Sequence, residues 1–105
     1  MNKTLYEVVA SRKREPQEGS YTCYLFEKGL DKILKKIGEE ASETIIAAKN
    51  HNNAETVGEI CDLLFHLAVL AVEEGIPFGD IEAELARRSE KIGNLKQMKQ
   101  VDHLT

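Results

Sequence analysis

The sequence predicts an all-α protein, and two observations carry this prediction. Between residues 30 and 49 the apolar residues recur every three or four positions, the spacing that places side chains on one face of a helix. No segment shows the alternation of apolar and polar residues that is typical of a strand. The residues of the 30–49 stripe are expected to face a core: Leu30, Ile33, Leu34, Ile37, Ala41, Ile45 and Ala48.

Two shorter helices are expected before this one. Residues 4–14 carry apolar residues at helical spacing and predict an amphipathic helix, and a loop follows it. Ser20 or Thr22 is suited to cap a short second helix that runs through Glu27 and ends at Gly29.

Two more helices follow the 30–49 segment. Asn53 is the expected N-cap of a helix over residues 54–74, which is apolar nearly all round and is therefore expected to be buried. Pro77 suits the first turn of a final helix that extends to about Lys91. Residues 93–105 have a weak pattern and are expected to form a loosely held tail. The residues expected to face inward from the final helix are Ile81, Leu85 and Ile92.

Length and composition predict one globular domain spanning residues 1–105. The sequence shows no membrane-spanning run and no secretion signal, so a cytoplasmic location is expected. The formal net charge of −4 argues against nucleic acid as the main partner. Cys23 and Cys61 have neither disulfide nor zinc spacing and are expected to be free thiols, with Cys61 as a packing residue.

Four acidic residues stand out on the two long helices. Glu59 and Asp62 lie in the apolar 54–74 segment, where ionised carboxylates are costly unless a positive charge meets them. Glu40 and Glu43 share a face of the preceding helix. A short turn makes the two helices antiparallel, and both acidic pairs lie at similar distances from that turn. The arrangement predicts a divalent cation held between the helices by carboxylate oxygens.

The donor types favour a hard cation, Mg²⁺ or Mn²⁺, over zinc. Such a site supports metal-assisted hydrolysis of a phosphoanhydride. A di-iron carboxylate site is the competitor, but it needs a Glu-x-x-His motif on two helices, and His66 follows Asp62 by four residues with no second such motif. His66 either orients an acid or is a hydrogen-bonded core histidine, and the second interpretation is favoured.

Lys32 and Lys36 precede the carboxylates on the same helix face. They are placed to contact phosphates bridged to a metal. The alternative is ordinary pairing of Lys36 with Glu40 on an exposed face, which contributes only a few tenths of a kcal/mol.

The acidic residues form two motifs, EExxE at residues 39–43 and ExxD at residues 59–62. Together they resemble the signature of the all-α nucleoside triphosphate pyrophosphohydrolases, the MazG-like superfamily. Within it, the chain resembles the phosphoribosyl-ATP pyrophosphohydrolases of histidine biosynthesis over most of its length. The motifs that carry this closer resemblance are SYT at residues 20–22, GLDK at 29–32 and KKIGEE at 35–40.

This resemblance implies hydrolysis of phosphoribosyl-ATP to phosphoribosyl-AMP and pyrophosphate, the second step of histidine biosynthesis, with Mg²⁺ required. It also implies a homodimer or higher homo-oligomer whose helices merge into a bundle, with the site near the subunit interface.

The resemblance assigns roles to individual residues. Glu40, Glu43, Glu59 and Asp62 match the metal-binding carboxylates, and Glu39 is either a further ligand or the base that activates water. The remaining residues match candidates for substrate contacts. These are Lys32 and Lys36 for the phosphates, Arg87, Arg88 and Lys91 for the additional 5′-phosphate, and Ser20, Tyr21 and Thr22, which either bind substrate or shape their loop.

Two other functions remain open. A general house-cleaning nucleoside triphosphate pyrophosphohydrolase would share the metal site and differ only in its base and ribose contacts. A non-catalytic helical interaction module would carry the same acids as surface or interface charge.

Overall fold

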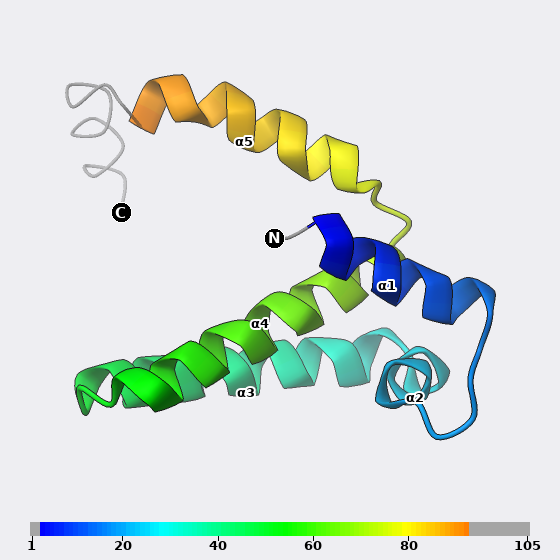
Figure 1. Cartoon of the computed structure of the whole chain (residues 1–105), viewed down its shortest axis with the longest axis horizontal. Helices are drawn as coiled ribbons and strands as arrows, with labels where there is room; N and C mark the ends of the chain where they lie inside the picture. The colour runs from blue at the N-terminus through cyan, green and yellow to red at the C-terminus, as the bar shows by residue number, and fades with distance from the viewer. Residues whose placement is uncertain (1–2, 93–105) are drawn as a thin grey trace. The chain divides into compact units, whose positions relative to one another are not determined.

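The all-α prediction is confirmed by the computed structural model, which describes residues 3–92, with side chains through residue 89 (Figure 1). This part of the chain contains five helices and no strand. The helices are α1 (Lys3–Arg14), α2 (Tyr21–Lys28), α3 (Leu30–Lys49), α4 (Asn53–Glu73) and α5 (Phe78–Ile92). The predicted tail at residues 93–105 lies outside the described residues.

Helices α3 and α4 form the predicted antiparallel pair, joined by a tight turn (Figure 1). At the end of α3 the His51 amide donates to the Ala48 carbonyl (3.0 Å) and the Asn52 amide donates to the Ala47 carbonyl (3.1 Å). With His51 at a φ of 55°, these bonds form a Schellman motif. The Asn52 side chain then accepts from the Glu55 amide and caps α4, so the predicted cap at Asn53 is wrong by one residue. Because the Schellman motif ends α3 in a short turn, α4 begins at Asn53, one residue earlier than predicted.

The junction between α2 and α3 is a single residue. Gly29 has φ 89° and ψ −171°, and its amide donates to the Leu25 carbonyl while its carbonyl accepts from the Ile33 amide. Because residues with a Cβ avoid this backbone region, glycine lets the chain leave one helix and enter the next without a loop. At the start of α2, Ser20, one of the two predicted caps, is the N-cap and accepts from the Cys23 amide (3.2 Å).

The core lies where α1 and α2 cover one end of the α3–α4 pair. Its fully buried residues come from all four helices: Val9, Leu25, Ile33, Ala68 and Val69. The other end of the pair, toward the turn, extends beyond α1 and α2 (Figure 1).

This arrangement corrects several burial predictions. On α3 the buried residues are Ile33, Glu40 and Ala47, spaced seven apart along the seam with α4. That seam is narrower than the apolar face, because an antiparallel helix pair buries a stripe that repeats about every 3.5 residues. The members of the predicted stripe that are exposed instead are Leu30, Leu34, Ile45 and Ala48.

Helix α4 is buried only in its second half, from His66 to Ala71. Val57, Ile60 and Cys61 are exposed, so the expectations of a buried helix and of a packed Cys61 are wrong for the first half. The reason is that α1 and α2 reach only the second half. Both cysteines are free thiols, as predicted.

The chain divides at Gly75 into two compact units, Met1–Gly75 and Ile76–Thr105. In the second, Ile81 is half-buried and Leu85 is 54% exposed, so the inward orientation predicted for Leu85 is wrong. The described part of this unit holds one helix, which cannot cover its own apolar side. The side chain of Ile92 lies outside the described residues, and the single domain over residues 1–105 stays a prediction. None of the helices between residues 3 and 92 is long and apolar enough to cross a membrane.

Candidate metal and substrate site

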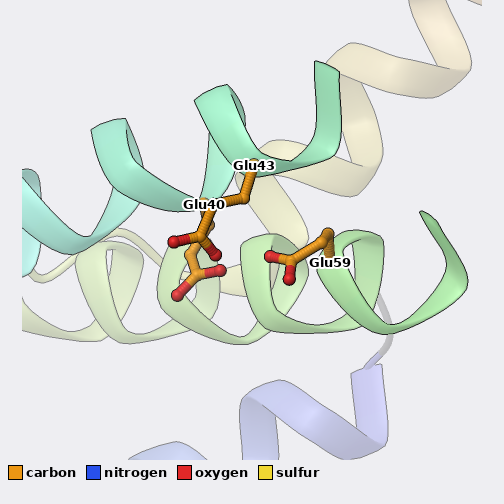
Figure 2. Close-up of side chains that lie close together, drawn as sticks. All are labelled: Glu40, Glu43 and Glu59. Carbon is orange, nitrogen blue, oxygen red and sulfur yellow. The ribbon is translucent and has the colours of Figure 1, made fainter. Parts of the chain in front are cut away.

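Three carboxylates converge between the two long helices. Glu40 and Glu43 come from α3 and Glu59 comes from α4, and one oxygen of each lies within 4.8 Å of the others (Figure 2). The spacing of three residues on α3 sends both of its side chains toward α4, and Glu59 points back toward them. The hairpin geometry predicted from the sequence therefore places these three acids together.

The cluster leaves two carboxylate oxygens without a hydrogen-bond donor. Glu40 is only 6% exposed, and Oε2 of Glu40 and of Glu59 are buried and accept no hydrogen bond from the described residues. The pKa of Glu59 is raised to about 7, first by hydrogen bonding to Glu40, then by hydrogen bonding to Glu43, by burial and by repulsion from both. Such a site requires either a shared proton or a cation.

A divalent cation fits this donor set. The three side chains offer only carboxylate oxygens, the ligands that Mg²⁺ and Mn²⁺ prefer over nitrogen or sulfur. The two buried oxygens that lack donors are free to coordinate. The residues placed to hold a cation are Glu40, Glu43 and Glu59.

Asp62, the fourth predicted ligand, lies outside this three-residue cluster. Its residue is exposed, although it follows Glu59 by three positions, the same spacing that separates Glu40 from Glu43. Its role as a metal ligand stays a prediction. Glu39 also lies outside the cluster, with its side chain 42% exposed and paired with Lys36.

Lys36 borders the carboxylates. Its Nζ lies 3.3 Å from Glu39 Oε2 and 3.9 Å from Glu40 Oε1. The pKa of Lys36 is raised, mainly by the hydrogen bond to Glu39, with smaller contributions from Tyr21 and Glu40. Pairing of Lys36 with Glu40 is thus present, but on a half-buried edge of the cluster rather than on the exposed face that the alternative interpretation assumes.

Tyr21 begins α2 beside this edge, and its neighbours are aromatic. Its hydroxyl lies 3.0 Å from His66 Nε2, and its ring stacks on Tyr24 and Phe65 at centroid distances of 6.0 Å. Lys32 Nζ lies 6.0 Å from the centre of the Tyr24 ring. The predicted substrate residues Tyr21 and Lys32 thus both contact the ring of Tyr24.

His66 is buried, with 4% exposure, and both of its ring nitrogens have partners, as in the favoured interpretation of a hydrogen-bonded core histidine. Its contact with Tyr21 was not predicted, and neither was the position of Tyr24. No spacing rule connects them, because Tyr21 and His66 are 45 residues apart. The sequence feature that could have drawn attention to His66 is its position one helical turn after Asp62.

Thr22, the next predicted substrate residue, is half-buried in the first turn of α2.

The basic residues predicted to bind the additional phosphate lie on α5, in the second unit. Arg87 and Arg88 both pair with Glu84, Arg88 Nε at 2.8 Å from Glu84 Oε2. The side chain of Lys91 lies outside the described residues. The roles of these three residues stay predictions.

Comparison with known proteins identifies the family. Residues 2–89 match the phosphoribosyl-ATP pyrophosphohydrolase family. The chain belongs to this family. The resemblance carried by the acidic and SYT motifs is therefore confirmed.

Similar proteins cover nearly the whole length. The phosphoribosyl-ATP pyrophosphatase of Listeria welshimeri is 53% identical over 104 residues, covering 99% of this chain and 100% of the relative. The phosphoribosyl-ATP pyrophosphatase of Clostridium botulinum is 59% identical over 93 residues, covering 89% of this chain and 84% of the relative. That of Limosilactobacillus fermentum is 52% identical, covering 97% and 96%. Membership of the phosphoribosyl-ATP pyrophosphohydrolase family makes the non-catalytic module the weakest of the three functions.

Proposed function

We propose that this chain hydrolyses phosphoribosyl-ATP to phosphoribosyl-AMP and pyrophosphate in histidine biosynthesis, in the cytoplasm, with Mg²⁺ as cofactor and Mn²⁺ as a substitute. The observation that carries the proposal is the cluster of Glu40, Glu43 and Glu59 with its two oxygens that lack donors. Family membership supplies the substrate.

The acidic and basic residues of the site have different proposed roles. Glu40, Glu43 and Glu59 hold the cation, and Asp62 is proposed as a fourth ligand. When bound, Mg²⁺ neutralises phosphate charge and lowers the pKa of water. Lys36 offers an ammonium group at the edge of the cluster and is placed to contact a phosphate oxygen. Glu39 is exposed enough to reach water and is the candidate base.

We also propose that the chain acts as a homodimer or higher oligomer. The turn end of the α3–α4 pair exposes large apolar residues: Ile45 (64%), Ile46 (59%), Val57 (62%) and Ile60 (44%). An apolar face of this kind on paired helices is typical of a surface that a further helix pair covers. A second copy would also exclude water from the neighbouring carboxylates.

The function is tested with purified protein, Mg²⁺ and two kinds of substrate. Pyrophosphate release from phosphoribosyl-ATP, and little from a panel of canonical nucleoside triphosphates, is the expected result. Release from the panel but not from phosphoribosyl-ATP would establish the house-cleaning function instead. Omitting the metal, and restoring it as Mn²⁺, serves as the control for the cofactor.

A further inference from the structure

A buried histidine of α4 holds the first residue of α2 through two hydrogen bonds in series. His66 Nδ1 lies 2.8 Å from the Asp62 carbonyl oxygen, and His66 Nε2 lies 3.0 Å from the Tyr21 hydroxyl. The His66 ring also packs edge-on against Tyr21 and Phe65. The pair therefore links the helix that carries Glu59 to the start of the helix that carries the SYT motif.

The partners determine which way each proton points. A backbone carbonyl only accepts, so Nδ1 carries the proton and donates to Asp62. In the neutral ring Nε2 then has a lone pair and accepts from the Tyr21 hydroxyl. The Tyr21 oxygen has thus used its only proton and retains lone pairs, which makes it an acceptor toward any further group.

Tyr21 is held in place and remains accessible. Its ring stacks on Tyr24 and on Phe65, yet the residue is 46% exposed. It also lies beside the face of α4 that carries Glu59, because its partner His66 follows Glu59 by seven residues, two turns of the same helix. An oriented, accessible acceptor therefore stands at the edge of the site proposed for the phosphates.

We propose that the Tyr21 hydroxyl oxygen accepts a hydrogen bond from a ribose hydroxyl of the nucleotide, and that His66 is a positioning residue that orients it. The phosphate oxygens of the scissile anhydride carry no proton at neutral pH and cannot donate to this oxygen. The nearest donors to the scissile anhydride are the hydroxyls of the ribose that bears the triphosphate. This inference rests on the proposed function and assigns Tyr21 to sugar recognition rather than to phosphate binding.

The first experiment removes one member of the proposed bond at a time. Tyr21→Phe keeps the stacked ring and deletes the hydroxyl, and the 2′-deoxy and 3′-deoxy forms of phosphoribosyl-ATP delete the possible donors. We expect Tyr21→Phe to raise KM about tenfold with kcat nearly unchanged, the loss typical of one hydrogen bond made equally in ground and transition states. One of the deoxy substrates should cause the same loss in the wild type and no additional loss in Tyr21→Phe. The proposal would be overturned if each deoxy substrate raised KM by the same factor in the wild type and in Tyr21→Phe.

The second experiment tests whether His66 acts through Tyr21. His66→Phe removes both bonds and keeps an aromatic ring, whereas His66→Gln retains an amide oxygen that can accept from Tyr21. We expect His66→Phe to match Tyr21→Phe in KM, the double variant to be no worse than either, and His66→Gln to recover part of the loss. Additive losses in the double variant would show that His66 is only a packing residue. If His66→Phe does not fold, the Tyr21→Phe and deoxy-substrate cycle still decides the sugar contact.

Tyr24→Phe is the matched control, since it removes a hydroxyl from the ring stacked on Tyr21 and should leave KM within about twofold of the wild type. Turnover by the wild type distinguishes a failure of the proposed function from a failure of the Tyr21 inference. No hydrolysis of phosphoribosyl-ATP would refute the function itself, whereas hydrolysis that responds equally to the deoxy substrates with and without the Tyr21 hydroxyl would refute this inference alone.

Discussion

Two glutamates show how far neighbours determine the chemistry of a single residue. The pKa of Glu59 is raised to about 7, first by hydrogen bonding to Glu40, whereas the pKa of Glu84 is lowered to about 2, first by hydrogen bonding to Arg87. The same side chain thus holds a proton near neutrality in one place and releases it in acid in the other. The first environment suits a cation site and the second is an ion pair on one helix.

These two shifts predict opposite dependences of stability on pH, in separate windows. A pKa raised from 4.5 to about 7 means that folded metal-free protein binds more protons than the unfolded chain, so the Glu59 contribution is complete below pH 4.5 and is lost as the pH rises through 7. The Glu84 contribution is complete above pH 4.5 and is lost as the pH falls through 2.

Thermal melts of metal-free protein between about pH 5 and pH 8 test the first window. We expect the melting temperature to fall more steeply with pH in the wild type than in Glu59→Gln, and excess Mg²⁺ to abolish or reverse the fall because binding displaces the proton. Parallel slopes for the two proteins would contradict the role of Glu59.

Glu40 gives a test of the metal site by substitution. We expect Glu40→Gln to reduce pyrophosphate release at least about a hundredfold, since a charged ligand is lost. The metal-free fold should be as stable as the wild type or more so, since the substitution neutralises a buried acid whose Oε2 has no hydrogen-bond donor. Assays of turnover and of the Mg²⁺-induced thermal shift measure the two effects. Glu55→Gln, an exposed acid one turn before Glu59, is the control and should retain both.

At the scale of elements, the backbone at the helix junctions decides where the site residues stand. Gly29 joins α2 to α3 at a φ of 89°, whereas Gly38 lies inside α3 in ordinary helical backbone, and neither glycine has a neighbouring atom within 4 Å of an added Cβ. Alanine at the two positions therefore differs only in the free energy that its backbone conformation requires.

We expect Gly29→Ala to lower the free energy of unfolding by about 1–3 kcal/mol, because alanine is strained at this φ and ψ. Gly38→Ala should raise it by about 0.5–1 kcal/mol, because alanine is the better helix former. Urea denaturation of both variants measures the difference. Equal changes of the same sign in the free energy of unfolding would contradict the strained backbone described for Gly29 at the α2–α3 junction.

At the scale of the whole molecule, the exposed apolar end of the α3–α4 pair predicts assembly. We expect Ile45→Glu combined with Val57→Glu to convert the oligomer to monomer and to reduce activity, because two buried charges oppose association. Sedimentation or light scattering, compared with pyrophosphate release, measures both consequences. Val8→Glu, which adds a charge at a half-exposed valine of α1, is the control and should keep the wild-type mass. A wild type that is monomeric at working concentrations would contradict the proposed oligomer.

Local patterns in the sequence were enough to predict the helices and the acidic pairing. Periodicity placed α3 at residues 30–49, and local residue preferences limited the cap of α2 to Ser20 or Thr22, because these features depend only on neighbours along the chain. The short turn forced α3 and α4 to be antiparallel, and that was enough to bring Glu40 and Glu43 to Glu59.

Tertiary structure alone decided which faces are buried and what His66 contacts. An apolar face is wider than the seam that one partner helix covers, so periodicity could not show that Ile33 is buried while Leu34 and Ile45 are exposed. The contact of His66 with Tyr21 depends on how α2 packs against α4, and no local spacing encodes it. Local rules set the elements, whereas burial and long-range hydrogen bonds follow from which surfaces meet.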